Sequence, residues 1–148
     1  MTETRILFLD FDDVLNTAQT LERGELFEQA NVQTLNAILD RTDAKIVITS
    51  TWRLGATRKE LEELLVNAGV HAAKRVVGST RFLEERSRGA EIQDWLSRTR
   101  MKVADYVILD NRNDMDACLC QLVRTDPRCG LSPGQVERVV SLLGGVAV

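Results

Sequence analysis

The chain has 148 residues, of which 44% are hydrophobic and 28% are charged, and its formal net charge is −3. These values are typical of one globular domain over residues 1–148, and they exclude a global positive field for binding nucleic acid. No apolar run approaches the length of a membrane-spanning helix, so we expect no membrane partner. The three cysteines have no metal-binding spacing, and we interpret them as reduced thiols of a cytoplasmic protein.

Apolar runs and helical patterns alternate along the chain, which is typical of an α/β fold with a mainly parallel sheet. The first three runs are nearly continuous, without polar alternation, as expected for strands that are covered on both faces. The expected strands are residues 5–10, 45–49, 105–110 and 122–125, with a short one at 76–77.

Two of the predicted helices begin at a capping box, in which Thr or Ser is followed three residues later by Glu or Gln. These boxes are formed by Thr57 with Glu60 and by Ser132 with Gln135. Apolar residues follow each box at helical spacing, and the same spacing marks two further helices. The expected helices are residues 28–41, 57–68, 87–98 and 132–143.

Three of the apolar runs end in a polar residue that core packing does not require: Asp10, Thr49 and Asp110. The first run continues as Asp-Phe-Asp, so Asp10 and Asp12 can face the same side of the chain. In an open parallel sheet the carboxyl ends of the strands lie along one edge, where ligands bind. We therefore expect these four side chains to form one site. The alternative for each residue, taken alone, is a helix cap or a turn.

The residue types suggest a role for each member of this site. Asp10, at the strand tip, is the natural nucleophile, and attack of its carboxylate on phosphorus gives an aspartyl-phosphate. Asp12 can protonate the leaving oxygen and later deprotonate the attacking water. A hard divalent cation, Mg²⁺, would relieve the repulsion between the carboxylates, with Asp110 as a further oxygen ligand. The hydroxyl of Thr49 can donate to a phosphoryl oxygen.

One basic residue should complete the site by balancing the charges of the phosphate and the nucleophile. We favour Arg88 because it begins the helix that leads into the strand ending in Asp110. The other candidates are Arg81, Arg86 and Lys74. For each of the arginines the alternative is a solvated surface charge.

Several segments resemble motifs of the haloacid dehalogenase-like (HAD) hydrolase superfamily. Residues 8–16, Phe-Leu-Asp-Phe-Asp-Asp-Val-Leu-Asn, are similar to its first motif, and residues 46–53, Ile-Val-Ile-Thr-Ser-Thr-Trp-Arg, are similar to its second. Val-Ile-Leu-Asp at 107–110, with Asp114 four residues on, is similar to its fourth, and Arg88 stands where the basic third motif is expected. The Thr-Trp-Arg segment and the Glu-Ile-x-x-Trp-Leu helix further resemble the HAD domain of Swiss Army knife RNA-repair proteins.

This resemblance implies a three-layer Rossmann-like fold and hydrolysis of a phosphomonoester. It implies that Asp10 is the nucleophile and that Asp12 is the acid/base, since the dehalogenases lack an acid at the position of Asp12. It also implies that Mg²⁺ is held by Asp10, the backbone carbonyl of Asp12 and Asp110.

The chain departs from the pattern of the superfamily at two positions. Asp13 stands where a glycine is usual, which adds a negative charge beside the site and removes backbone freedom. Asp110 is followed by Asn111, whereas the fourth motif often has paired acids. The second group that supports the metal is then Asp114, or Asn111 serves as a neutral ligand outside the metal's first coordination sphere.

The connections between the motifs leave no room for a separate cap domain. An uncapped site is open and suits bulky phosphorylated substrates, such as a polynucleotide end or a phosphoprotein. Alternatively, a second subunit could close it over a small metabolite, and the sequence does not set the oligomeric state. We expect Ser50, Trp52 and Arg53 to contact the substrate, with Trp52 stacking on a base and Arg53 holding a phosphate. The alternative is that Trp52 packs under the flap, the short segment between Asn16 and the helix expected at 28–41, and that Arg53 forms a surface ion pair.

Two other functions are weighed against the phosphatase. A receiver-like signalling module also has carboxylates and a hydroxyl at strand ends, but its acceptor lies on a middle strand, whereas the middle run here ends in Thr49. A non-catalytic HAD-like binding protein would explain Asp13 and Asn111 as drift. We rank the phosphatase first.

Overall fold

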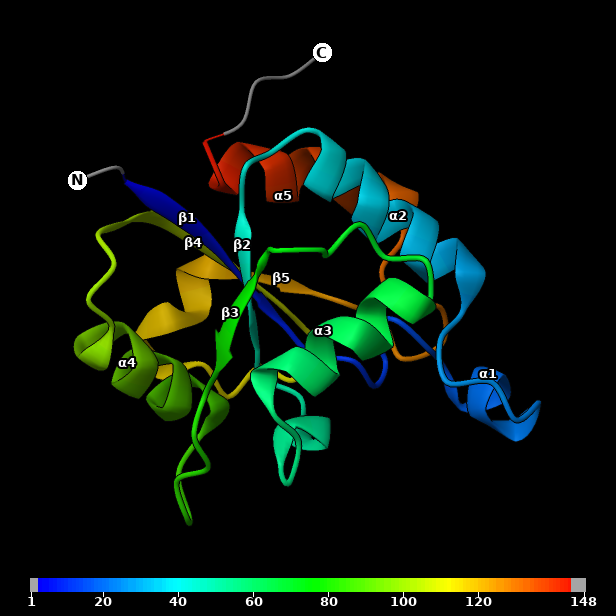
Figure 1. The fold of residues 1–148 in the computed structure, drawn as a ribbon, viewed down its shortest axis with the longest axis horizontal. Coiled ribbons are helices and arrows are strands. Elements are labelled where there is room, and N and C mark those ends of the chain that lie inside the picture. Colours follow the sequence, from blue (N-terminus) through cyan, green and yellow to red (C-terminus); the bar gives the residue numbers. More distant parts are fainter. Residues whose placement is uncertain (1–2, 145–148) are drawn as a thin grey trace.

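The computed structural model describes residues 3–144, so residues 1–2 and 145–148 of the expected domain lie outside the described part. At its centre is a five-stranded sheet with the order β3-β2-β1-β4-β5, in which all paired strands are parallel (Figure 1). The strands are β1 (Thr4–Leu9), β2 (Lys45–Ile48), β3 (Val76–Ser79), β4 (Val103–Asp110) and β5 (Leu122–Arg124). The prediction of a parallel α/β sheet is therefore confirmed.

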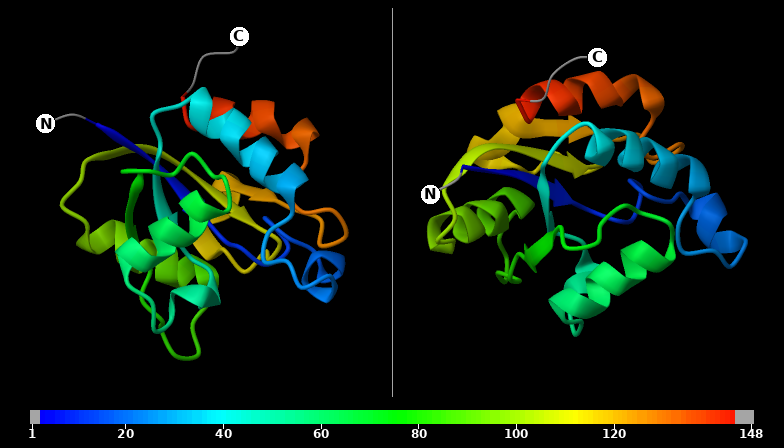
Figure 2. Two further views of the ribbon diagram at one scale, coloured as in Figure 1. Left: turned by 45° about the vertical axis from the view of Figure 1, so that its right-hand side comes forward. Right: turned by 45° about the horizontal axis from the view of Figure 1, so that its top comes forward.

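Helices cover both faces of this sheet and make three layers (Figures 1 and 2). The helices α2, α3 and α5 pack on one face, and α4 packs on the other with the 3₁₀ segment η2. The helices are α1 (Ala18–Glu22), α2 (Gln29–Asp40), α3 (Arg58–Asn67), α4 (Arg88–Arg98) and α5 (Val136–Leu142), and the 3₁₀ segments are η1 (Thr51–Arg53), η2 (Asp116–Gln121) and η3 (Pro133–Gln135). None of the helices among residues 3–144 is long and apolar enough to cross a membrane.

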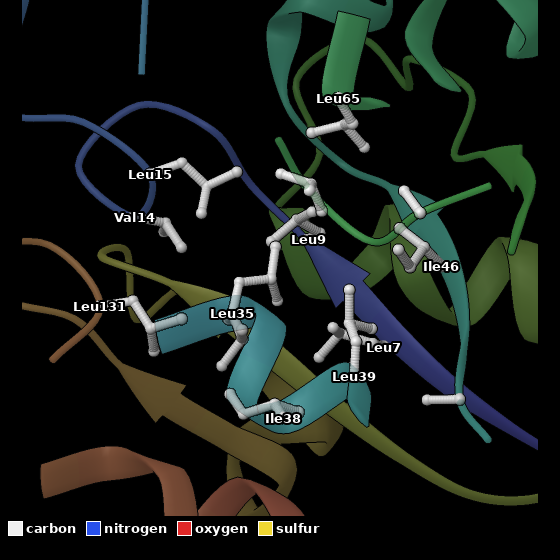
Figure 3. Packing of buried hydrophobic residues seen from close by; sticks show 14 of the residues in the cluster. Leu7, Leu9, Val14, Leu15, Leu35, Ile38, Leu39, Ile46, Leu65 and Leu131 are labelled. Carbon is white, nitrogen blue, oxygen red and sulfur yellow. The ribbon is translucent and has the colours of Figure 1, made fainter. Parts of the chain in front are cut away.

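The central strand β1 shows why its sequence is apolar throughout. Successive side chains of a strand point to opposite faces, and both faces are covered here. Leu7 and Leu9 belong to the buried cluster with Leu35 and Leu39 of α2, as Figure 3 shows. The intervening Phe8 belongs to the cluster on the other face. Residues 6–11 are consequently all buried, and partial exposure begins only at Asp12 and Asp13, beyond the end of the strand.

All of the expected strands and four of the helices form near the predicted residues. The capping boxes at Thr57 and Ser132 are both present, although the second one opens a 3₁₀ turn, η3, before α5 begins. The short segments α1, η1 and η2 were not predicted. With three to six residues each, they are too short to show an apolar period.

The connections around the carboxyl edge are as short as the sequence indicates. Residues 16–45 contain α1 and α2, and residues 51–88 contain η1, α3 and β3. Because α2 and α3 pack on the sheet, β3 extends it, and α1 and η1 have only five and three residues, neither connection forms a cap domain.

Gly89 marks a close approach between the start of α4 and the segment after β4. Its N–H donates to the carbonyl of Asp114 at 3.0 Å. A Cβ atom at this position would lie 2.1 Å from the carbonyl oxygen of Met115, which is far inside contact distance. Only glycine therefore lets α4 start here and direct Arg88 toward the sheet.

We predict that Gly89→Ala lowers the free energy of unfolding by about 3 kcal/mol, because α4 must move away from Met115. Urea unfolding monitored by circular dichroism measures this loss of free energy of unfolding. Gly134→Ala is the matched control, since a Cβ at Gly134 meets nothing within 4 Å. Equal stability of the two variants would contradict the prediction.

Candidate active site

The carboxyl ends of three neighbouring strands bring the predicted residues together. The N–H of Asp10 donates to the carbonyl of Leu109, and the N–H of Thr49 donates to the carbonyl of Leu9. These bonds continue the ladders of β1 with β4 and with β2 by one step. Asp10, Thr49 and Asp110 are thus adjacent, although they are far apart in the sequence.

Arg88 is the basic residue that reaches this group. Its Nη1 donates to the carbonyl oxygen of Thr49 at 2.7 Å and lies 3.2 Å from Oδ2 of Asp110 and 3.7 Å from Oδ1 of Asp10. All four residues are almost inaccessible to solvent, with exposed fractions of 5% for Asp10, 0% for Thr49 and Asp110, and 4% for Arg88. One buried cation therefore faces two buried carboxylates.

The other basic candidates lie elsewhere. Arg81 is exposed and forms a two-pronged ion pair with Asp94 on the outer side of α4. Lys74 and Arg86 are exposed. Of the four candidates, Arg88 lies beside the two carboxylates, and its catalytic role stays a prediction.

Burial and the nearby charge of Asp110 raise the pKa of Asp10 to about 7. Arg88 and a hydrogen bond from the N–H of Phe11 act in the opposite direction but do not cancel these effects. When Asp10 and Asp110 are both ionised, their two negative charges exceed the single positive charge of Arg88. A second cation at the same place would favour the ionised, nucleophilic form of Asp10.

Asp12 is held by two side-chain donors. Nδ2 of Asn16 donates to its Oδ1 at 3.1 Å, and Nε1 of Trp52 donates to its Oδ2 at 3.0 Å. Each carboxylate oxygen of Asp12 consequently accepts one hydrogen bond from a side chain. Asn16 was not predicted as a site residue, although it ends the motif that begins with the first strand.

Asp13 has a left-handed backbone, with φ of 66°, which explains why glycine is usual at this position. Aspartate is one of the few other residues that tolerate this conformation. The carbonyl of Asp13 accepts a hydrogen bond from the hydroxyl of Thr125, and its carboxylate accepts one from the side chain of Asn111 at 3.3 Å. Burial and the charges of Asp12 and Asp110 raise the pKa of Asp13.

Asp114 already has partners within the chain. Its Oδ1 accepts a hydrogen bond from Nε of Arg112 at 2.9 Å, and its Oδ2 accepts one from the N–H of Arg88 at 3.1 Å. These contacts place Asp114 at the start of α4, where it fixes the backbone of Arg88. The predicted role of Asp114 in metal binding stays a prediction, and it would require these partners to be exchanged.

The residues predicted to contact substrate also have partners in the chain. Ser50 accepts a hydrogen bond from the N–H of Trp52 and so caps η1. The guanidinium of Arg53 is buried, donates to the carbonyls of Thr80, Thr49 and Ser50, and forms an ion pair with Glu91 at 3.1 Å. The alternative prediction for Arg53 was a surface ion pair. Arg53 does form an ion pair, but the pair is buried. Substrate contact by Ser50, Trp52 and Arg53 stays a prediction.

The donor set fits a hard divalent cation. Oδ2 of Asp110 and Oγ1 of Thr49 are buried and have no hydrogen-bond partner among the described residues. A carboxylate oxygen that accepts no hydrogen bond and lies beside a second carboxylate is a suitable ligand for Mg²⁺, and a hydroxyl without a hydrogen-bond partner can bind a phosphoryl oxygen. No group of three or more His, Cys, Asp or Glu side chains within residues 3–144 is placed to hold a metal ion. The predicted ligands, Asp10, Asp110 and the carbonyl of Asp12, include only two buried carboxylates, and metal binding by them stays a prediction.

Comparison with known families identifies the group to which the chain belongs. The family model of the HAD domain in Swiss Army Knife RNA repair proteins matches residues 6–136, which include every site residue described above. The chain is therefore a member of this HAD family, and the predicted resemblance is confirmed. Membership indicates a hydrolase of phosphatase type that acts on a phosphorylated substrate. A search of curated proteins finds no significant match, and neither does a search of solved structures.

The raised pKa of Asp10 predicts how stability depends on pH in the absence of divalent cations. The unfolded chain ionises this group near pH 3.8, but the folded chain does so only near pH 7, so the folded state binds more protons between these values. The contribution of Asp10 to the free energy of unfolding should therefore fall as pH rises from 4 to 7, by at most about 1.4 kcal/mol per pH unit. Urea unfolding in EDTA at several pH values, for the wild type and Asp10→Asn, measures this difference. Parallel curves for the two proteins would refute it.

Removal of Arg88 should leave two buried carboxylates without their cation. We expect Arg88→Ala to lower the free energy of unfolding in EDTA at pH 7.5 by about 3 kcal/mol. Arg86→Ala, two residues earlier and exposed, is the control and should cost less than about 0.5 kcal/mol. Losses of the same size in both variants would show that Arg88 is not needed to balance the site.

Proposed function

We propose that the chain is a magnesium-dependent phosphatase that hydrolyses a phosphomonoester through an aspartyl-phosphate on Asp10. One observation carries the proposal: Asp10, Asp110, Thr49 and Arg88 are buried together at the carboxyl edge of the sheet, where Oδ2 of Asp110 and Oγ1 of Thr49 have no hydrogen-bond partner among the described residues. Core packing alone does not account for two adjacent buried carboxylates, because their burial costs free energy.

In the proposed first step, a carboxylate oxygen of Asp10 attacks phosphorus and the bond from phosphorus to the leaving oxygen breaks. Asp12 gives its proton to that oxygen, so an alcohol leaves rather than an alkoxide. The hydroxyl of Thr49 donates to a phosphoryl oxygen, and Arg88 balances part of the charge. In the second step Asp12 takes a proton from water, the water oxygen attacks phosphorus, and the bond to Asp10 breaks to release phosphate.

Asp10, the carbonyl of Asp12 and Asp110 would hold Mg²⁺ in this proposal. The ion would neutralise the phosphoryl oxygens and keep Asp10 ionised. Asp114 and Asn111 are the candidates for supporting it from outside its first coordination sphere.

We also propose that the substrate is bulky, such as the phosphorylated end of a polynucleotide. The family description supports RNA as a substrate, and the absence of a cap among residues 3–144 supports an open site. The net charge of −3 gives no support to tight non-specific binding of nucleic acid. The cytoplasmic location stays a prediction.

The test is hydrolysis of p-nitrophenyl phosphate by the wild type with and without Mg²⁺. We expect activity that is lost in EDTA and that falls by at least about 10³-fold in Asp10→Asn, because that variant has no nucleophile. Asp43→Asn, an exposed position just before the amino end of β2, is the control and should keep full activity. Comparable turnover by Asp10→Asn would reject the nucleophile.

Acid-quench labelling with a phosphate donor separates the remaining alternatives. Label that appears on Asp10 and turns over supports the phosphatase. A label that persists, or that lies on another residue, would favour the receiver-like module. The absence of both label and Mg²⁺ binding by calorimetry would favour a non-catalytic binding protein.

A further inference from the structure

The indole of Trp52 meets the carboxylate of Asp12 from a different part of the chain. Trp52 lies in η1, directly after β2, and Asp12 lies after β1, 40 residues away in sequence. The Nε1–H of Trp52 donates to Oδ2 of Asp12 at 3.0 Å. A tryptophan N–H can only donate, so the direction of this hydrogen bond is fixed.

The position of the indole does not depend on Asp12. The ring stacks on Phe27, with centroids 5.6 Å apart, and meets the edge of Phe11 at 5.5 Å. Its backbone N–H is capped by Ser50. Trp52 is therefore a rigid donor held by aromatic packing, whereas the aspartate side chain has two torsions that something must fix.

Asn16 is the second side-chain donor to the carboxylate of Asp12. Asn16 donates to Oδ1 of Asp12 with the same amide nitrogen that donates to the carbonyl of Leu26 in the flap. Phe27, the next residue, stacks on Trp52. Both donors are thus tied to the same short stretch of the flap.

We propose that Trp52 is a positioning residue that, together with Asn16, aims the carboxyl group of Asp12 at the leaving oxygen of the substrate. This inference rests on the proposed function, in which Asp12 is the acid/base. Proton transfer requires the carboxyl group within hydrogen-bond reach of the leaving oxygen, and a displacement of 1 Å can cost about 100-fold in rate. Trp52 acts through Asp12, and the role requires no contact between the indole and the substrate.

The test compares substrates that differ in how much they need an acid. A p-nitrophenolate leaves readily without a proton, whereas an alkyl phosphate must have its leaving oxygen protonated. Trp52→Phe keeps an aromatic ring for packing and removes the N–H. We expect kcat/KM to fall about 100-fold for the alkyl phosphate and only a few-fold for p-nitrophenyl phosphate.

The chain offers a matched control in its second tryptophan. Trp95 of α4 packs edge-on against Phe8 in the core between α4 and the sheet, so Trp95→Phe should leave the ratio of the two kcat/KM values unchanged. If Trp52→Phe folds poorly, replacement of Trp52 by 3-benzothienylalanine keeps the two fused rings and still removes the N–H. The same selective loss is expected.

A double-mutant cycle with Asp12→Asn tests whether Trp52 acts through Asp12. In the Asp12→Asn background, Trp52→Phe should cause no further fall in kcat/KM for p-nitrophenyl phosphate. Equal losses on both substrates in a folded Trp52 variant, or fully additive losses in the cycle, would overturn the inference. Full activity of Asp10→Asn would instead overturn the proposed function, so the two failures are distinguishable.

Discussion

The arrangement of this chain depends on two carboxylates that are buried side by side. Asp10 and Asp110 end neighbouring strands, and neither can be moved without changing the register of β1 with β4. Their repulsion in a dry environment is balanced in part by Arg88. The position of Arg88 is set in turn by the hydrogen bond from its N–H to Asp114 and by the close approach that Gly89 allows. The start of α4 therefore places a positive charge beside the two carboxylates at the edge of the sheet.

A second buried arginine, Arg53, binds the backbone of the surrounding loops rather than the carboxylates of the site. The guanidinium of Arg53 binds the carbonyls that follow β2 and β3 and pairs with Glu91 of α4. Glu91 uses its other oxygen to accept the N–H of Leu83, so the pair fixes the loop that leads from β3 to α4. The ion pair of Arg53 with Glu91 therefore holds together the loops that follow β2 and β3. The positive charge of Arg88, in contrast, faces the carboxylates of Asp10 and Asp110.

The sequence predicts the frame of the site better than the contacts within it. Continuous apolar runs and the polar residues that end them were enough to place Asp10, Thr49 and Asp110 on one edge, because parallel strands leave little choice. Arg88 could be chosen by its place in the chain. The hydrogen bond from Trp52 to Asp12 and the ion pair of Arg53 with Glu91 could not be predicted, since each depends on how separate loops fold over the sheet. The helix α1 was missed because five residues are too few to show a period.

The two departures from the superfamily pattern are best understood together. The turn after Asp12 requires a left-handed residue, and aspartate meets this requirement while adding a carboxylate. That carboxylate accepts a hydrogen bond from Asn111, the residue that stands where a second acid is frequent. An aspartate at position 111 would set another negative charge against Asp13, close to Asp110, and would have no proton to donate at neutral pH. The amide removes that repulsion and supplies a donor. The acid missing from the end of β4 is thus replaced by one on the turn after β1, and the edge keeps its negative charge with a different residue carrying it.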